Sequence, residues 1–334
     1  MKLPDKHPSL PSKKTGILLV NLGTPDSTNW FDIRKYLKEF LSDKRVIELN
    51  PLVWKIILNV FILTFRPSKT AKAYKEIWME KENISPLRYY TEKQTEKLRE
   101  KFKSENIKVD YAMRYGNPSI KIKMKEMQKK GCQTIVILPL YPQYAAATTA
   151  TVCDEVYRSL MLMRWQPNIQ IIPHYESEPI YIEALKKSVT NTLKQIKWKP
   201  DIIVASYHGI PKKYFDKGDP YHCYCQKTTR LLKEKLKIKI PIITTFQSRF
   251  GPDEWLQPYT DKTFEDLPKE GKKNILVICP GFASDCVETL EEISIQGKES
   301  FVENGGQNFL MIPCLNDNTD HIKLLEHLTK KYLF

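Results

Sequence analysis

The chain has 334 residues, of which 41% are hydrophobic and 28% are charged, a balance that excludes a disordered or membrane-spanning protein. Lys and Arg outnumber Asp and Glu by 53 to 39, so the formal net charge is +14 and suitable partners are nucleic acid, an anionic membrane surface or an acidic small molecule. The basic residues are spread along the chain without an RNA-binding signature or zinc-finger spacing, so we expect no nucleic-acid partner.

The cysteines and the N-terminal residues bear on the compartment. Seven cysteines in a chain of this length do not form a dense disulfide framework, and their odd number leaves at least one thiol unpaired. Residues 1–14 are basic but contain no apolar stretch, so they do not form a secretory signal. We therefore expect a cytoplasmic protein, and a peripheral position on the inner face of the cell membrane stays open.

Short apolar runs rich in β-branched residues alternate with amphipathic stretches, the pattern of βαβ units that build a parallel sheet. The expected strands are 17–22, 109–114, 134–138 and 169–173 in the first half, and 202–207, 242–245, 275–279 and 309–312 in the second. Because the halves match in strand number and spacing, we predict an α/β fold of two similar Rossmann-like, doubly wound domains. Each is expected to hold a parallel four-stranded sheet, with the active site in the cleft between the domains.

Apolar positions three or four residues apart locate two helices that divide the chain. One falls within residues 182–196 and is predicted to join the halves, and the other, within 317–333, reads as a closing helix. The predicted domains are therefore residues 15–174 and 175–315, followed by a C-terminal helix at 316–334 that packs back on the body.

The longest apolar run, residues 51–65, lies in the first predicted domain and has the sequence PLVWKIILNVFILTF. Its 15 residues fall short of the roughly 20 that a membrane-spanning helix needs. Since its apolar side chains occur on more than one helical face, we expect this stretch, the apolar lip, to lie on a membrane. Trp54 would sit near the interface, and Arg66 and Lys69 would face anionic head groups. The alternative is a buried core helix.

Side chains suited to chemistry follow three of the predicted strands. NLGTP (21–25) follows the first strand, SYHG (206–209) ends the fifth, and PGFASD (280–285) follows the seventh. Ligands of open α/β sheets bind beyond the carboxyl ends of the strands. His208 is thus a candidate proton acceptor or metal ligand, because imidazole does both near neutral pH. The alternative is a hydrogen-bonded structural histidine.

The run ASDCVETLEEI after the seventh strand carries three acids at helical spacing. Asp285, Glu288 and Glu292 are three and then four residues apart, so an α-helix would place them on one face as an acidic stripe. Alternatively, Asp285 and Glu288 form a capping box, and Glu291 is solvated surface. The capping box leaves Glu292 unexplained.

Signatures of two common kinds of enzyme site are missing. Neither GxxxxGK[ST] nor GxGxxG follows a predicted strand, and no GxSxG elbow occurs. Nucleotide chemistry and acyl transfer by a serine nucleophile are therefore poorly supported.

An ordered set of motifs resembles the ferrochelatase family from about Gly16 to the last helix. The matching segments are GILLVNLGTPDS, MRYGNPSI, LPLYPQYAAATT, SYHGIP, GDPYHCYCQKT, FQSRFGPDEWLQP and ASDCVETLEE. This resemblance implies a lyase that inserts Fe²⁺ into protoporphyrin IX, releasing two protons and forming protoheme at the last step of heme biosynthesis. No cofactor beyond the substrate iron is implied.

The resemblance also implies roles for individual residues. His208 and Glu288 would face each other across the porphyrin, bind Fe²⁺ and act in catalysis. Asp285 and Glu292 would extend the acidic path behind Glu288, for protons or for metal. The residues implied to bind porphyrin are Arg114, which would meet a propionate, and Tyr115, Tyr144 and Trp255. Residues 51–65 fall at the family's hydrophobic lip, which admits substrate from an anionic membrane surface.

The chain departs from some relatives in two places. It has no C-terminal cysteine extension of the kind that holds a two-iron, two-sulfur cluster in some members, so no iron–sulfur cluster is expected. Cys223 and Cys225 with Cys279 or Cys286 are a poor cluster signature. At Cys286 some relatives place a His, which puts metal ligation there in doubt.

Several alternatives stay open. One alternative within the same fold is a chelatase that takes coproporphyrin III instead of protoporphyrin IX. Another is a chelatase that inserts cobalt into a different tetrapyrrole. A non-catalytic heme or porphyrin carrier would use His208 as an axial ligand but gives the acidic stripe no purpose. A nucleic-acid-binding protein would show strongly salt-dependent binding. Monomer and homodimer fit the sequence equally.

Overall fold

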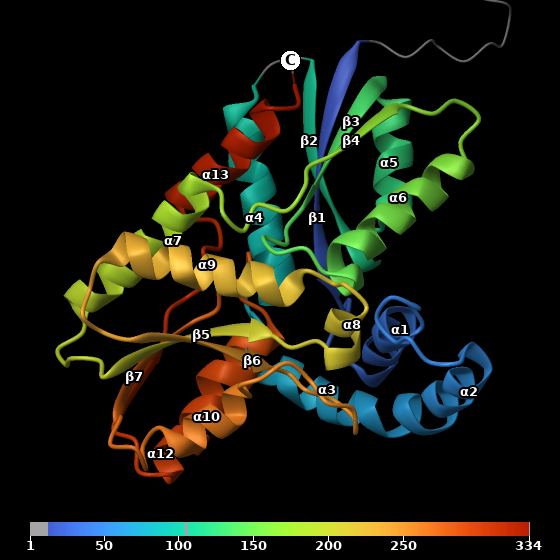
Figure 1. Cartoon of the computed structure of the whole chain (residues 1–334). Helices are drawn as coiled ribbons and strands as arrows, with labels where there is room; N and C mark the ends of the chain where they lie inside the picture. Colours follow the sequence, from blue (N-terminus) through green and yellow to red (C-terminus); the bar gives the residue numbers. More distant parts are fainter. Residues whose placement is uncertain (1–12, 104–105, 334) are drawn as a thin grey trace, which may run out of the picture.

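The structure, a computed structural model, describes residues 13–103 and 106–333. In this part of the chain, eight strands form two parallel sheets of four strands each (Figure 1). The first sheet contains β1 (Lys14–Thr24), β2 (Ile107–Gly116), β3 (Cys132–Pro139) and β4 (Asn168–Ile171). The second contains β5 (Ile202–His208), β6 (Ile242–Gln247), β7 (Asn274–Ile278) and β8 (Asn308–Met311). Each strand overlaps a predicted one, so the predicted α/β fold with two parallel sheets is confirmed.

Both sheets have the same strand order, β2-β1-β3-β4 and β6-β5-β7-β8. In each, the chain moves from an inner strand to one edge and then crosses to the other side. The order therefore reverses between β1 and β3 and between β5 and β7. Loops that leave the sheet at such a reversal diverge and make room for a ligand. His208 ends β5 and Glu288 follows β7, so both lie at the reversal of the second sheet.

Alternate residues of β1 face opposite helical layers, as the two-residue period of a strand requires. Leu18 and Val20 pack with residues of α5 (Ile120–Lys129) and α6 (Thr151–Met161) on one face of the sheet. Ile17 and Leu19 face the other side, where α4 (Pro86–Lys101) lies. Being covered on both faces explains why β1 reads as a continuous apolar run.

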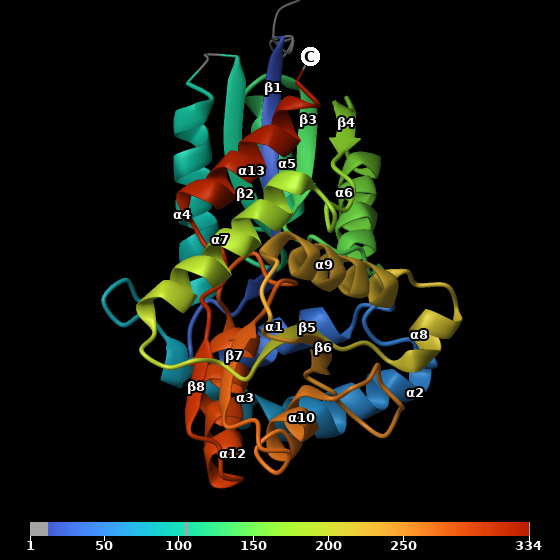
Figure 2. The same ribbon diagram turned by 60° about the vertical axis from the view of Figure 1, so that its left-hand side comes forward.

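One hydrophobic core lies between the two sheets and belongs to both. It joins β1 and β5 through residues of α4, α7 (Pro179–Gln195), α9 (Tyr221–Leu236) and α13 (Thr319–Lys330). The last helix, α13, returns to pack on α4 and α7, and Figures 1 and 2 show these helices between the sheets. α7 and α13 are the two helices predicted to join the halves and to close the chain. The domain boundaries at 174/175 and 315/316 stay a prediction.

The remaining helices cover the outer faces and the loops. In the first half they are α1 (Trp30–Leu41), α2 (Pro51–Ile56), η1 (Ile57–Ile62), α3 (Leu63–Ile77) and η2 (Ala146–Ala150), where η marks a π-helix. In the second half they are α8 (Lys212–Asp216), α10 (Thr260–Asp266), α11 (Val287–Thr289), η3 (Leu290–Gly297) and α12 (Lys298–Glu303). Helix α3 packs against α11 and η3, so a helix of the first half lies beside the site segment of the second.

The apolar lip folds as α2, η1 and the start of α3, with one side buried and the other exposed. Trp54, Leu58 and Leu63 are buried together with residues of α1. The indole of Trp54 donates a hydrogen bond to the carbonyl oxygen of Leu41 at 2.7 Å, so the predicted interfacial position of Trp54 is wrong. The exposed apolar side chains are Leu52, Val53, Ile56, Val60, Phe61 and Phe65. No helix in the described ranges is long and apolar enough to cross a bilayer.

Candidate active site

His208 is the last residue of β5, and a hydrogen bond within its own turn selects the tautomer of its neutral ring. Its Nδ1 lies 2.6 Å from the carbonyl oxygen of Gly209. Because a carbonyl oxygen only accepts hydrogen bonds, Nδ1 carries the proton in the neutral ring and Nε2 presents a lone pair. The imidazole is half-buried, so Nε2 is available as a proton acceptor or metal ligand.

The acidic segment does not form the α-helical stripe that the sequence predicts. Cys286 is in an extended conformation and is the N-cap, and the helix begins only at Val287. After Thr289 the chain continues as the π-helix η3, whose backbone hydrogen bonds span five residues instead of four. The reciprocal cap is formed by Cys286 and Thr289, so the alternative of an Asp285–Glu288 capping box is wrong as well.

Asp285 lies before the helix and serves as a buried anchor. Its carboxylate accepts hydrogen bonds from the side-chain amide of Asn316 at 2.6 Å, the hydroxyl of Thr289 at 3.1 Å and the backbone N–H of Cys314 at 3.2 Å. These donors tie the segment after β7 to the loop after β8. The physical reason for the failed prediction is the extended backbone at Cys286, which removes Asp285 from the helical face.

Glu292 is half-buried, one turn beyond Glu288. It accepts hydrogen bonds from the backbone N–H of Ser248 at 2.6 Å and from the Ser248 hydroxyl, and the side-chain amide of Gln247 lies 3.4 Å from Oε2. Burial raises the pKa of Glu292, whereas the Ser248 hydrogen bond and His208 lower it and the charge of Glu288 raises it further. Glu292 is therefore close enough to His208 and to Glu288 to feel the charge of each.

Glu288 faces the helices of the first half. Its negative charge adds to burial in raising the pKa values of Tyr36 on α1 and Tyr74 on α3. Burial also raises the pKa of the neighbouring Cys286 thiol, and Glu288 raises it further. A thiol in this environment is protonated at neutral pH, so Cys286 is a weak candidate for metal binding.

Arg114 has a protein partner instead of a free guanidinium. It forms an ion pair with Asp43 in which the two side chains are 7% and 10% exposed, and its Nε donates to the carbonyl of Thr151 at 2.8 Å. The Tyr115 ring lies 4.3 Å from the guanidinium carbon, and its hydroxyl donates to Asp43 at 3.1 Å. The structure thus places Arg114 and Tyr115 together at the end of β2, with the cation already neutralised.

Arg66 is a second cation near the acidic segment, and its surroundings differ from those expected at a membrane surface. Its guanidinium stacks on the Phe250 ring at 4.5 Å, and its Nη1 is buried without a hydrogen-bond partner. Burial lowers the pKa of Arg66, and the negative charge of Glu288 opposes this shift. Because the guanidinium stacks on Phe250 and its Nη1 is buried, the predicted position facing membrane head groups is wrong. The only signal in the sequence is its place directly after the lip.

Trp255 follows β6 in the second half of the chain, and Tyr144 follows β3 in the first. A Cβ on Gly209 would come within 3.1 Å of the Trp255 ring, so this indole lies against the residue that follows His208. Its Nε1 donates to the carbonyl of Phe250 at 3.0 Å. Tyr144 is partly buried in the first half, where burial and the charge of Asp219 raise its pKa. The structure brings Trp255 to His208 and keeps Tyr144 near Asp219.

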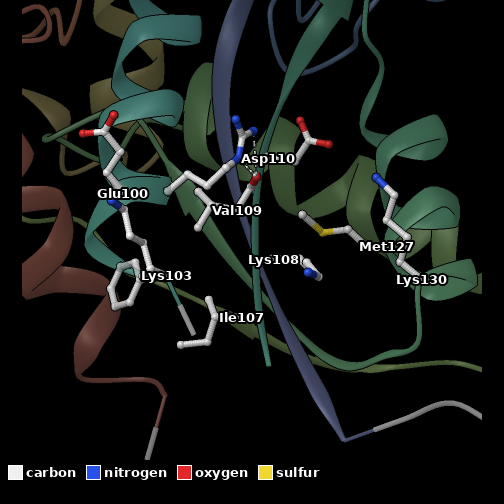
Figure 3. Close-up of a pocket in the computed structure, with 10 residues that line it drawn as sticks. Glu100, Lys103, Ile107, Lys108, Val109, Asp110, Met127 and Lys130 are labelled. Carbon is white, nitrogen blue, oxygen red and sulfur yellow. Dashed lines mark hydrogen bonds between the residues drawn. The ribbon is translucent and has the colours of Figure 1, made fainter. Parts of the chain in front are cut away.

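One cavity in the described part of the chain lies away from this site. About 630 Å³ in volume, it lies at the start of β2 and is lined by Arg99, Glu100, Phe102, Lys103, Ile107, Lys108, Val109, Asp110, Met127 and Lys130 (Figure 3). None of the predicted site residues lines it. It opens at the amino end of the first sheet, whereas His208 and Glu288 follow the carboxyl ends of their strands.

The cysteines are unpaired in the described part of the chain. Cys223 is exposed and Cys225, Cys279 and Cys286 are buried, and all are free thiols. Within residues 13–103 and 106–333, no three His, Cys, Asp or Glu side chains converge in a way that could hold a metal ion.

The fold resembles that of solved chelatases. SirB from Bacillus subtilis, solved with Fe³⁺, matches with a TM-score of 0.57 at 14% sequence identity, covering 95% of both chains. The sirohydrochlorin chelatase SirB from Bacillus subtilis subspecies spizizenii, solved with cobalt, matches with a TM-score of 0.56 at 12% identity, covering 95% of this chain and 94% of the other. The chain therefore has the two-sheet α/β fold of the chelatases.

Sequence relatives identify the family within that fold. The Ferrochelatase family model matches residues 14–333. Ferrochelatase of Allorhizobium ampelinum is 54% identical over 99% of this chain and 97% of its own length, and ferrochelatase of Rhizobium etli is 53% identical over 99% and 96%. The chain belongs to the ferrochelatase family. It is a chelatase that inserts iron into a porphyrin to make heme.

Proposed function

We propose that the substrate is protoporphyrin IX and that it binds beyond the carboxyl ends of β5 and β7, with His208 on one side and Glu288 on the other. The observation that carries this proposal is the hydrogen bond from His208 Nδ1 to Gly209, which leaves Nε2 as a lone pair beside two carboxylates. A proton acceptor next to an acidic pair suits a reaction that exchanges two pyrrole protons for one divalent cation.

The chemistry follows from what a free porphyrin requires. Fe²⁺ cannot enter the ring until both inner N–H protons leave, and a planar ring keeps the nitrogen lone pairs in its plane. Binding energy that bends the ring towards the metal-insertion geometry is therefore used to stabilise the transition state. Trp255, which lies against Gly209, supplies a flat apolar surface next to His208.

His208 is proposed to take a pyrrole proton at Nε2. Glu288 is proposed to bind the incoming Fe²⁺ on the other side of the ring, and Glu292 to pass protons or metal onwards. Asp285 is proposed to anchor the segment that carries this path, because its carboxylate accepts hydrogen bonds from three protein donors.

Arg66 is proposed to bind a propionate of the porphyrin. Its Nη1 is a buried donor without a partner, and such a group costs free energy unless a ligand satisfies it. Arg114 is less suited to this role, because Asp43 already neutralises it.

We also propose that the protein is cytoplasmic and that its lip rests on the anionic inner face of the cell membrane. Its exposed apolar side chains include Leu52 and Phe65, which are 77% and 73% exposed. Such a face on a short helical segment suits the interfacial layer of a bilayer, and the net charge of +14 favours anionic lipid.

Anaerobic incubation of the pure protein with protoporphyrin IX and Fe²⁺ or Zn²⁺, followed by visible absorption, tests the proposal. Turnover many times the enzyme concentration is expected, and faster turnover of coproporphyrin III would overturn the substrate assignment. Stoichiometric binding without metal insertion would support a carrier instead.

A further inference from the structure

Gln247 is a buried residue next to the proposed catalytic groups, and nothing in the reaction itself assigns it a role. It ends β6 and pairs in register with His208, the end of β5. Its carbonyl oxygen accepts a hydrogen bond from the N–H of Gly209 at 2.8 Å. The carbonyl oxygen of Gly209 in turn accepts a hydrogen bond from Nδ1 of His208. The backbone of Gln247 therefore holds the turn that orients the imidazole.

The side chain of Gln247 reaches the acidic segment. Its Nε2 donates to the backbone carbonyl of Glu288 at 2.7 Å and lies 3.4 Å from a carboxylate oxygen of Glu292. The carbonyl of Glu288 is at the passage from α11 to the π-helix η3. One amide thus fixes the backbone from which the Glu288 side chain projects.

Buried hydroxyls hold this amide in a single orientation. Ser206 donates to Oε1 of Gln247 at 2.7 Å. Ser206 lies 2.9 Å from the hydroxyl of Thr260, which donates to Thr245 at 2.8 Å. All three hydroxyl residues are buried, so turning the amide would leave polar groups unsatisfied in a low-dielectric interior.

We propose that Gln247 is a positioning residue that sets the separation between the imidazole of His208 and the carboxylate of Glu288. The main chain of Gln247 pairs with that of His208, and its side-chain amide donates a hydrogen bond to the backbone carbonyl of Glu288. The inference rests on the proposed roles of His208 and Glu288. Gln247 itself is not assigned a contact with porphyrin or iron.

Such a role predicts an effect on turnover and not on substrate affinity. A displacement of about 1 Å between reacting groups costs on the order of a hundredfold in rate. Porphyrin affinity depends on the apolar surfaces and cations around the ring, which Gln247 does not supply. Loss of the amide should therefore lower kcat and leave KM for porphyrin nearly unchanged.

Two substitutions and one control test the inference. Gln247→Met keeps the length and removes the side-chain hydrogen bonds to Glu288, Glu292 and Ser206. Gln247→Glu keeps an acceptor for Ser206 but replaces the donor to the Glu288 carbonyl with a carboxylate oxygen that repels it. The control is Gln94→Met, because Gln94 is also buried and its amide donates to Ser284 at 2.9 Å in the same segment after β7, without reaching Glu288.

We expect kcat of both Gln247 variants to fall by about tenfold or more while KM for protoporphyrin IX stays within about threefold of wild type. Gln94→Met should keep kcat within about threefold, even where its thermal midpoint falls as far as that of Gln247→Met. A role in stability alone would lower kcat of Gln94→Met and Gln247→Met alike, and that result would overturn the inference.

Further outcomes separate the two levels of the proposal. Wild-type kcat in the Gln247 variants, or a rise in KM at unchanged kcat, refutes the positioning role and leaves the proposed function intact. Failure of the wild-type protein to insert metal refutes the proposed function instead. Should Gln247→Met not fold, Ser206→Ala frees the amide without changing Gln247, and a fall in kcat at constant KM is expected there too.

Discussion

The carboxylate of Asp43 neutralises the guanidinium of Arg114 in a pair that is almost completely buried. The two residues are 71 positions apart, and the pair joins the segment after α1 to the end of β2. The Tyr115 hydroxyl also donates a hydrogen bond to Asp43. Removal of this one carboxylate therefore deprives both the Arg114 guanidinium and the Tyr115 hydroxyl of their partner.

Asp43→Ala should therefore lower the free energy of unfolding by about 3 kcal/mol, because it leaves a buried cation without its partner. Urea denaturation at neutral pH measures the change. The matched control is Asp216→Ala, which breaks the exposed pair with Lys212 and should cost less than about 1 kcal/mol. Equal losses in the two variants would contradict a structural role for the Asp43–Arg114 pair.

His208→Ala should lower kcat for metal insertion by about a hundredfold or more, because a positioned base contributes 10²–10⁴ in rate. Porphyrin binding, followed by fluorescence quenching, should persist, and added imidazole should restore part of the activity. His327→Ala serves as control, since His327 bonds to Glu178 on a distant surface. Full activity of His208→Ala would remove the residue from the mechanism.

Glu288→Gln should abolish turnover while porphyrin remains bound. The amide has nearly the shape of the carboxylate but lacks the negative charge that Fe²⁺ requires. Initial rates at increasing Fe²⁺ concentration provide the measurement, and Glu291→Gln, on the neighbouring surface, is the control. Wild-type turnover in Glu288→Gln would rule out the assigned role.

Arg66→Leu should raise KM for porphyrin by about tenfold or more, the loss expected for a charge-assisted hydrogen bond of about 1.5–3 kcal/mol. The effect on kcat should be smaller, since Arg66 is not assigned a contact with the pyrrole nitrogens. Initial rates at varied porphyrin concentration separate the two constants. If KM for Arg66→Leu matches that of wild type, Arg66 does not bind the propionate and another cation must do so.

Glu292 should make stability depend on pH in a defined direction. Burial raises its pKa in the folded protein above the ordinary value of 4.5, so the folded state binds the proton more tightly than the unfolded state. The contribution of Glu292 is therefore most favourable below pH 4.5 and is lost as pH rises towards the folded pKa. The free energy of unfolding of Glu292→Gln, measured relative to that of wild type across this range, should increase with increasing pH. A difference that is constant with pH would contradict the raised pKa.

The lip should control membrane association. Phe61→Ser combined with Phe65→Ser removes two exposed rings, each worth about 1.5–3 kcal/mol when buried in an apolar phase. Co-sedimentation with vesicles of mixed neutral and anionic lipid should fall at least tenfold. Met161→Ser is the control, because Met161 is as exposed but lies at the end of α6. Equal loss in this control would disconnect membrane binding from the lip.

The strands and the place of His208 were predictable because they depend on local sequence. Strands such as β1 are covered on both faces and therefore show unbroken apolar runs. The errors came from contacts that no local pattern reveals. Asp285 left the helical face because Cys286 is extended. The Asp43 partner of Arg114 is equally invisible to local patterns, because it lies 71 residues away in the sequence. Trp54 turned inwards for the same kind of reason, a carbonyl acceptor on another helix.

The shared core between the sheets has a consequence for biosynthesis. Leu324, Leu325 and Leu328 of α13 complete the layer that covers β1 from one side. During translation, the first half must therefore wait for a helix that follows the whole second sheet in the chain before that face of its own sheet is closed. Until then the growing chain displays an open apolar face, a condition that invites chaperone binding.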